Sequence, residues 1–187
     1  LIAPQINHDF IHIPTKDIFS LMLQSSEWSD QPLAHPHYLS IYRIGQVARS
    51  YGKVILGGEG SDDLFCGYSH HSSSKVVSSH FAFRPFIDIN DFTSLFPCQF
   101  GFIDNYLQMR NASQSLLEIR NLEIKTHLKS LLARNDQMFM ASSVEPRAPF
   151  LGSFISDYAL KRNPNCFISS KLKGKSIVKE LLLARQP

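Results

Sequence analysis

Cysteine is scarce in this chain, and the copies that are present form no recognisable pattern. The sequence has 187 residues and three cysteines, at positions 66, 98 and 166. An odd number cannot pair completely, and no two of them have the Cys-x-x-Cys spacing of a zinc or redox motif. The composition therefore excludes a disulfide-stapled scaffold and indicates a reduced, cytoplasmic setting.

Long hydrophobic runs and a strong charge of one sign are also missing. No apolar stretch approaches the roughly 18 residues of a membrane-spanning helix, and no signal peptide is visible, so we expect no membrane partner. The net charge is only +3. The single dense basic stretch is too short to argue for nucleic acid, and lysines that face phosphate fit it as well. Its members are Lys171, Lys173, Lys175 and Lys179.

What the chain does contain is the composition of a folded domain with one good core. Hydrophobic residues make up 43% and charged residues 19%, which is ordinary for a globular protein. The order strand, helix, helix, strand predicts an α/β fold with a parallel sheet and crossovers, followed by a mostly helical half. Thr15 is the expected cap of the first helix. The predicted strands cover residues 8–13 and 53–56, and the predicted helices cover 15–24, 38–50, 113–134, 154–162 and 174–185.

The most informative segment is an acidic, glycine-rich loop after the apolar strand that ends at Leu56. Its sequence is Gly57-Gly58-Glu59-Gly60-Ser61-Asp62-Asp63. In open α/β sheets, ligands bind beyond the carboxyl ends of buried strands, and glycines let phosphate oxygens approach the backbone. Asp62 suits Mg²⁺, and Glu59 suits proton transfer from an amine. The alternative is an ordinary Gly/Asp turn with a helix N-cap at Ser61.

Two further segments carry weaker signals. Glu145 and Arg147 lie two residues apart in an extended, proline-limited segment, so we expect them on one side, with a structural ion pair as the simplest interpretation. Gly174 precedes a predicted helix and places Lys175 in its first turn. A lysine is unfavourable there unless an anion lies nearby, which indicates phosphate contact; a solvated basic turn is the alternative.

The histidine pairs His35/His37 and His70/His71 are candidate metal ligands. Neither pair has helical i, i+4 spacing, and no cysteine or acid lies beside them in the sequence. We therefore expect neither pair to bind a metal. Cys66 follows an apolar pair and is expected to pack rather than to react.

In this order and spacing, the three segments resemble the synthetase domain of glutamine-dependent asparagine synthetases and their relatives, the β-lactam synthetases and lasso-peptide macrolactam cyclases. The family's loop Ser-Gly-Glu-Gly-Ser-Asp-Glu-Leu-Phe-Gly-Gly-Tyr corresponds to residues 57–68. Its motif Arg-Asn-Asp-x-Met-x-Met-Ala-x-Ser-x-Glu-x-Arg-x-Pro-Phe-Leu-Asp corresponds to residues 134–152, and its closing lysine-bearing helix to residues 173–187. The resemblance covers essentially the whole chain. It implies a partial Rossmann-like sheet of the adenine nucleotide α-hydrolase (PP-loop) type.

The resemblance also implies ATP-dependent amide-bond formation. A small-molecule or peptide carboxylate attacks the α-phosphate of ATP and gives an acyl-adenylate and pyrophosphate. Ammonia or an amine then displaces AMP, and a glutaminase domain is one source of the ammonia. The implied site residues are the catalytic Glu59 and Lys175, the Mg²⁺-associated Asp62, and the nucleotide-binding Gly57, Gly58, Gly60 and Ser61.

The chain departs from the family pattern at several positions, although Glu59, Asp62 and Lys175 are kept. We therefore expect a divergent member and do not assume that aspartate is the substrate. The departures are Gly57 for serine, Asp63 for glutamate, Cys66 for glycine, Gly152 for aspartate, and Pro146 inside the second motif.

Two features of the family do not occur in these 187 residues. One is the Ser-Gly-Gly-x-Asp-Ser nucleotide loop, and the other is a glutaminase domain with its terminal cysteine. We therefore expect residues 1–187 to be the C-terminal portion of a longer synthetase, binding ATP poorly and making no amide alone. The rival hypothesis is a non-catalytic or partner-dependent interaction module derived from the family.

Overall fold

The computed structural model describes residues 8–33, 35–72 and 115–185, which form a mixture of helices and one small parallel sheet. The chain divides into two compact units. The first unit is Leu1–Glu59, Lys129–Gly152 and Arg185–Pro187, and the second is Gly60–Leu128 and Ser153–Ala184.

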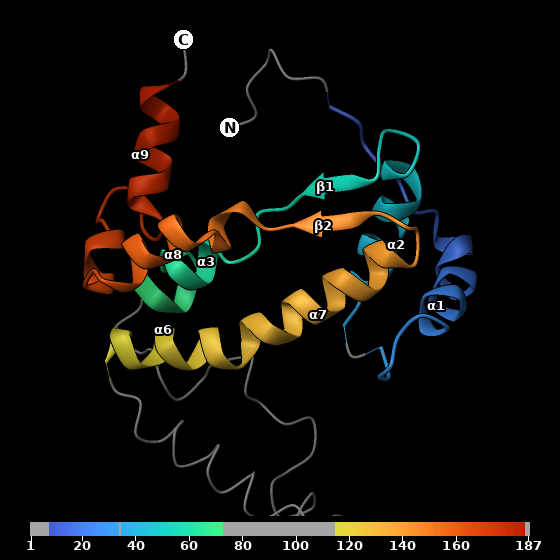
Figure 1. The fold of residues 1–187 in the computed structure, drawn as a ribbon, viewed down its shortest axis with the longest axis horizontal. Helices are drawn as coiled ribbons and strands as arrows, with labels where there is room; N and C mark the ends of the chain where they lie inside the picture. The colour runs from blue at the N-terminus through green and yellow to red at the C-terminus, as the bar shows by residue number, and fades with distance from the viewer. Residues whose placement is uncertain (1–7, 34, 73–114, 186–187) are drawn as a thin grey trace, which may run out of the picture. The chain divides into compact units, whose positions relative to one another are not determined.

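The first unit holds the sheet. Its strands β1 (Val54–Leu56) and β2 (Glu145–Arg147) pair in parallel, with Val54 opposite Glu145 (Figure 1). The other elements of this unit are η1 (Thr15–Asp17), α1 (Ile18–Ser26), α2 (His37–Ala48), most of α7 (His127–Met140) and η5 (Pro149–Leu151).

A small hydrophobic core joins α1, α2 and α7 in this unit. Leu21, Tyr38, Tyr42 and Met138 are buried together. Gly45 of α2 lets α7 approach, because a Cβ at this position would lie only 3.3 Å from the Phe139 ring. The apolar positions of α1 and α2 recur at helical spacing, which explains why these segments are amphipathic helices.

Backbone hydrogen bonds extend the strand pair at both ends. Glu145 N donates to Lys53 O over 2.7 Å, and Gly57 N donates to Arg147 O over 2.8 Å. Parallel pairing therefore continues to the first glycine of the acidic loop, which fixes where that loop begins.

The second unit is helical in its described residues. It contains α3 (Ser61–Leu64), η2 (Ser69–Ser72), α6 (Leu116–Lys125), α8 (Ser153–Leu160), η6 (Pro164–Phe167) and α9 (Ser176–Ala184). Its core includes Leu64, Phe65, Ile119, Leu122 and Phe167, and the rings of Phe65 and Phe167 meet edge to face with centroids 5.1 Å apart.

A buried arginine closes the end of α8. The Arg120 guanidinium donates to the carbonyls of Ala159 at 3.0 Å and of Leu160 and Arg162 at 3.4 Å. The last carbonyls of a helix lack intrahelical donors, so a buried cation satisfies them and favours the negative end of the helix dipole. Burial lowers the pKa of Arg120, but a guanidinium stays charged at neutral pH.

Several predicted elements are confirmed with shifted ends, and others are wrong. The strand at 53–56 and the helices near 38–50, 154–162 and 174–185 are present. Residues 8–14 form no strand, because an extended segment becomes a strand only where a neighbouring strand takes up its hydrogen bonds. Thr15 begins a 3₁₀ turn whose cap is Pro14, so it does not cap α1.

The predicted helix over residues 113–134 is two helices, with residues 113 and 114 outside the described residues. The break falls at Thr126, the C-cap of α6, whose φ of −118° and ψ of −72° differ from the typical α-helical values of about −63° and −42°. Thr126 is β-branched and its hydroxyl donates back to Leu122 O, a contact that accompanies bends in helices.

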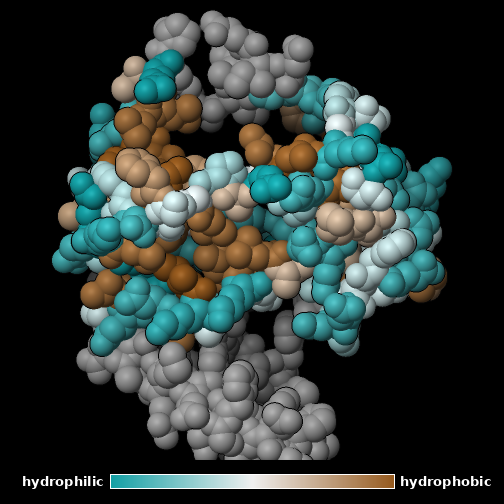
Figure 2. Space-filling model, viewed as in Figure 1, coloured by the Kyte–Doolittle hydropathy of each residue, from teal (hydrophilic) through white to brown (hydrophobic). Residues whose placement is uncertain are grey.

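We expected the strand before the acidic loop to be buried, but β1 is largely exposed. Val54 and Leu56 are 56% and 72% exposed. Hydrophobic side chains also gather on α9, where Leu181, Leu182 and Leu183 are exposed (Figure 2).

The parallel pair confirms the α/β character, and the Rossmann-like arrangement stays a prediction. No helix in the described part of the chain is long and apolar enough to cross a membrane.

Candidate functional site

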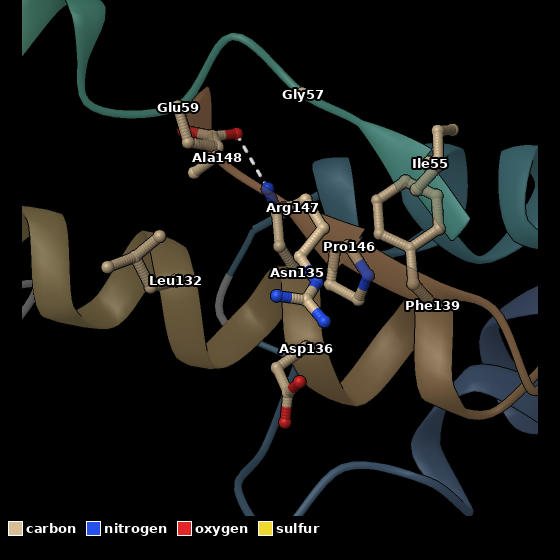
Figure 3. A pocket seen from close by; sticks show the side chains of 10 residues that line it. All are labelled: Ile55, Gly57, Glu59, Leu132, Asn135, Asp136, Phe139, Pro146, Arg147 and Ala148. Atoms are coloured by element: carbon tan, nitrogen blue, oxygen red, sulfur yellow. Dashed lines mark hydrogen bonds between the residues drawn. The ribbon is translucent and has the colours of Figure 1, made fainter. Parts of the chain in front are cut away.

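The catalytic glutamate expected from the sequence lines a pocket in the first unit. Glu59 follows β1 and accepts a hydrogen bond of 2.8 Å from the Asn135 side-chain amide of α7. Asn135 is buried, so this amide holds the carboxylate in one orientation. The pocket measures about 220 Å³, and Figure 3 shows the ten residues that line it.

The pocket has an apolar end and a polar end. Ile55, Phe139 and Pro146 lie together at one end, while Glu59 and Asn135 face each other at the other (Figure 3). Arg147 also lines it and forms an ion pair of 2.8 Å with Glu145, which confirms the predicted pairing. A small apolar pocket with a few placed polar groups is the usual form of a ligand site.

The second unit brings the other expected site residues together. The Lys175 ammonium lies 2.8 Å from a carboxylate oxygen of Asp62 and 3.4 Å from the Ser61 hydroxyl. These side chains are separated by more than a hundred residues in the sequence. Their exposed fractions, 26% for Lys175 and 36% for Asp62, leave the pair open to solvent on one side.

Unusual backbone geometry holds Lys175 in place. Its φ is +56°, a left-handed conformation that costs a non-glycine residue roughly 1–2 kcal/mol. The sequence predicted Lys175 in the first turn of the helix. It lies instead immediately before α9, which begins at Ser176. Its backbone N–H donates to Phe65 O over 3.0 Å, and Lys179 N donates to Lys175 O over the same distance.

Two glycines make this approach possible. A Cβ at Gly174 would collide with the Cys66 carbonyl oxygen and lie 2.9 Å from Gly67 Cα. A Cβ at Gly67 would overlap the Asp62 carboxylate and lie 2.7 Å from Lys175 Cε. Glycine at both positions therefore leaves the space that the ion pair occupies.

A polar hollow adjoins this glycine contact. It measures about 590 Å³ and includes Gly67 and Gly174 in its lining. Its other lining groups include the hydroxyl residues Ser69, Ser72, Ser169 and Ser170 and the lysines Lys173 and Lys179. Hydroxyl donors and ammonium groups are the groups that bind phosphate and carboxylate oxygens.

The third acid of the loop is buried rather than directed at a ligand. Asp63 is only 1% exposed, and the Tyr68 hydroxyl lies 3.4 Å from its carboxylate. Burial is the main reason that the pKa of Asp63 rises to about 6; the negative charges of Glu123 and Asp62 add to it, and hydrogen bonds act against it. Cys66 is fully buried, and burial raises the pKa of its thiol to about 12, as expected of a packing residue.

The family model for asparagine synthase matches residues 3–187 of this chain. The chain belongs to the asparagine synthase family. An asparagine synthetase (glutamine-hydrolysing) of Bacillus subtilis is 24% identical in an alignment that covers 83% of this chain and 31% of that protein. Putative asparagine synthetases of Mycobacterium bovis and Mycobacterium tuberculosis are 32% identical over 75 residues, which is 40% of this chain and 11% of theirs. No solved structure matches the chain.

Five of the site residues predicted from the family resemblance fall into two groups in the structure. Gly57 and Glu59 line the pocket of the first unit, and Ser61, Asp62 and Lys175 meet in the second. The cap of α3 is Gly60, at a φ of 83°, so the alternative of an N-cap at Ser61 is wrong. Gly58 lies exposed, with nothing within 4 Å of a Cβ built on it.

Sequence reasoning missed two residues that shape these sets. Asn135 lies in the second family motif, but its partner Glu59 is 76 residues away and only the fold shows the contact. The role of Gly67 depends on the Asp62 and Lys175 side chains beside it, which only the fold brings together. The sequence signal that could have pointed to Gly67 is its place in the Gly-Tyr pair that ends the first family motif.

The space beside Gly67 can be tested by filling it. Gly67→Ala is expected to lower the free energy of unfolding by about 1–3 kcal/mol, because the added methyl group pushes Asp62 and Lys175 apart. Gly52→Ala is the matched control, since nothing lies within 4 Å of a Cβ there, and we expect a change within about 0.5 kcal/mol. Urea unfolding of both variants measures the difference, and equal stabilities would contradict the proposed crowding.

The buried Asp63 predicts a dependence of stability on pH. Between about pH 4 and pH 6 the folded chain keeps a proton on Asp63 that the unfolded chain has released, so this group destabilises the fold progressively as pH rises. Asp63→Asn removes that loss, and the variant should gain about 2–3 kcal/mol relative to the wild type between pH 4 and pH 7.

Urea unfolding across this pH range measures the gain, with the exposed Asp157→Asn of α8 as the control. A difference between Asp63→Asn and the wild type that does not change with pH would show that Asp63 is not held in its protonated form.

Proposed function

We propose that this chain carries residues for ATP-dependent amide-bond formation through an acyl-adenylate. The observation that carries the proposal is the meeting of Lys175 with Asp62 and Ser61, three positions that match the asparagine synthase motifs. A polyphosphate needs cations, hydroxyl donors and a metal-binding carboxylate, and this group supplies one of each.

In the first step a carboxylate oxygen of the substrate attacks the α-phosphorus of ATP, and the bond to pyrophosphate breaks. Negative charge grows on the phosphate oxygens as this bond breaks. The Lys175 ammonium is suited to stabilise that charge, because it is partly shielded from water and held by the backbone before α9. Ser61 is suited to donate its hydroxyl hydrogen to a phosphate oxygen.

A magnesium ion fits the oxygen atoms beside Lys175. Mg²⁺ is bound through one or two carboxylates plus substrate phosphates and keeps several waters. Asp62, which is partly exposed, would supply the carboxylate, and the Ser61 hydroxyl lies beside it. When bound, the ion offsets the charge of the pyrophosphate that leaves. With Asp62 holding the ion, the Lys175 ammonium would be available to a phosphate oxygen.

In the second step the nitrogen of ammonia or an amine attacks the acyl carbon, AMP leaves, and the nitrogen loses a proton. Glu59 is suited to accept this proton, since it lines a pocket and its carboxylate is oriented by Asn135. The backbones of Gly57, Gly58 and Gly60 are proposed to contact the nucleotide. The substrate is a carboxylate of a small molecule or peptide, and the donor is ammonia or an amine.

We also propose that these 187 residues do not form amides by themselves. The family's Ser-Gly-Gly-x-Asp-Ser loop is not among them, and in the family that loop holds the pyrophosphate and shares the metal. The chain alone is therefore expected to bind ATP weakly and to release no AMP. Release of AMP that depends on ATP would contradict this.

The role of Glu59 is tested in the complete gene product by following pyrophosphate and amide separately. Glu59→Gln should slow amide formation by about 10²–10⁴-fold, because general-base catalysis contributes this much, while pyrophosphate formation falls less. Glu27→Gln, at an exposed glutamate of the same unit, should change either rate by less than about twofold.

If Glu59→Gln leaves both products unchanged, Glu59 is not part of the mechanism. If the wild type forms neither product with any carboxylate, the rival hypothesis of a non-catalytic interaction module is favoured instead.

A further inference from the structure

We propose that His70, His71 and Glu123 form a binding site for a divalent transition-metal ion of the zinc type. The site lies in the second unit, where η2 meets α6. None of its three ligands is a residue assigned to amide formation, so the metal site does not depend on the proposed function.

The three side chains converge on one point. His70 Nε2 lies 2.7 Å from one oxygen of Glu123, and His71 Nε2 lies 2.6 Å from the other. One ligand atom from each residue falls within 4.8 Å of the others. The two imidazole rings have centroids 4.3 Å apart and stand at 60° to each other, so they present their Nε2 atoms from different directions.

A tetrahedral zinc ion fits this spacing with small movements. Zinc binds imidazole nitrogen and carboxylate oxygen at about 2.0–2.2 Å, so two ligand atoms of one ion lie about 3.3 Å apart. The observed separations of 2.6 and 2.7 Å would widen by less than about 1 Å on binding. Two histidines and one glutamate are also a known zinc ligand set that leaves a fourth position for water.

Burial supplies the second argument. The side chains of His71 and Glu123 are fully buried, and the buried carboxyl of Asp63 contributes to the negative charge around them. A carboxylate is costly to bury unless a cation or several donors compensate it. A divalent ion supplies more positive charge to these carboxylates than one protonated imidazole does.

The hydrogen bonds do not satisfy the cluster completely. His71 Nδ1 is buried and has no hydrogen-bond partner among the described residues. His71 would bind the ion through Nε2, which faces Glu123, so Nδ1 takes no part in the proposed coordination. Aromatic packing restricts the cluster as well, because the Tyr68 ring stacks on His70 at 5.4 Å and contacts His71 at 5.5 Å.

The sequence offers His70 and His71 as candidate ligands, but we expected no metal there because the carboxylate that completes the site is remote. Glu123 lies 52 residues after His71 and is supplied by α6. The two histidine pairs therefore differ in their surroundings. His70 and His71 share a buried carboxylate, whereas His35 and His37 have rings equally close, at 4.3 Å, but are exposed.

An ion at this position would join the segment after the acidic loop to α6. Tyr68 and η2 follow directly on Gly67, the glycine that makes room for Asp62 and Lys175. The ion would therefore stabilise the second unit where the loop ends, as structural metal ions stabilise the folded state over the unfolded one.

The experiment uses the 187-residue chain freed of metal with a chelator and titrated with Zn²⁺ or Co²⁺. The wild type should retain one ion per chain after dialysis, show the visible absorption of tetrahedral Co²⁺, and melt at a higher temperature with metal. His70→Ala and Glu123→Gln should each weaken binding at least about tenfold, because even ligand-supporting residues cost 10–100-fold.

The double variant His35→Ala/His37→Ala is the matched control and should bind as the wild type does. His70 is partly exposed, so His70→Ala decides the question if Glu123→Gln fails to fold. The proposal is overturned if the wild type retains no ion. It is equally overturned if His70→Ala binds normally or if the control variant loses the ion.

Discussion

A close contact between two backbone segments determines the geometry of the second unit. Gly174 lies against the backbone of Cys66 and Gly67, and the Lys175 N–H donates to Phe65 O. A Cβ at Gly174 would collide with the Cys66 backbone and separate the segments, and a Cβ at Gly67 would overlap the Asp62 carboxylate. Beside this contact Lys175 adopts a left-handed conformation, and its ammonium lies 2.8 Å from Asp62. Strain of this kind persists only where surrounding structure holds it, and it often marks functional positions.

The three acids of the loop illustrate how one short segment serves several purposes. Glu59 faces a pocket and is oriented by Asn135. Asp62 meets a cation, and Asp63 is buried with the Tyr68 hydroxyl beside it. Three carboxylates directed at one phosphate would repel it. Their separate surroundings remove that conflict, because only Asp62 combines partial exposure with a paired cation.

Sequence patterns predicted the elements that depend on local chemistry. The helix near 38–50, the short strand before the loop and the Glu145–Arg147 pair follow from periodicity and spacing. Features that depend on distant partners were missed or wrong: the strand at 8–13, the exposed β1, and the contacts of Glu59 with Asn135 and of His71 with Glu123. Nothing local in the sequence encodes which remote side chain completes such a group.

The central claim is that Lys175, held beside Asp62, stabilises phosphate charge during adenylate formation. Exchange of labelled pyrophosphate into ATP by the complete gene product measures that step directly. Lys175→Met should reduce the exchange by about 10²–10³-fold, as the loss of one charge-stabilising donor does elsewhere. Lys161→Met, which breaks the exposed 3.0 Å pair with Asp157, should leave it within about twofold. Equal exchange by the Lys175 variant and the wild type would contradict the account.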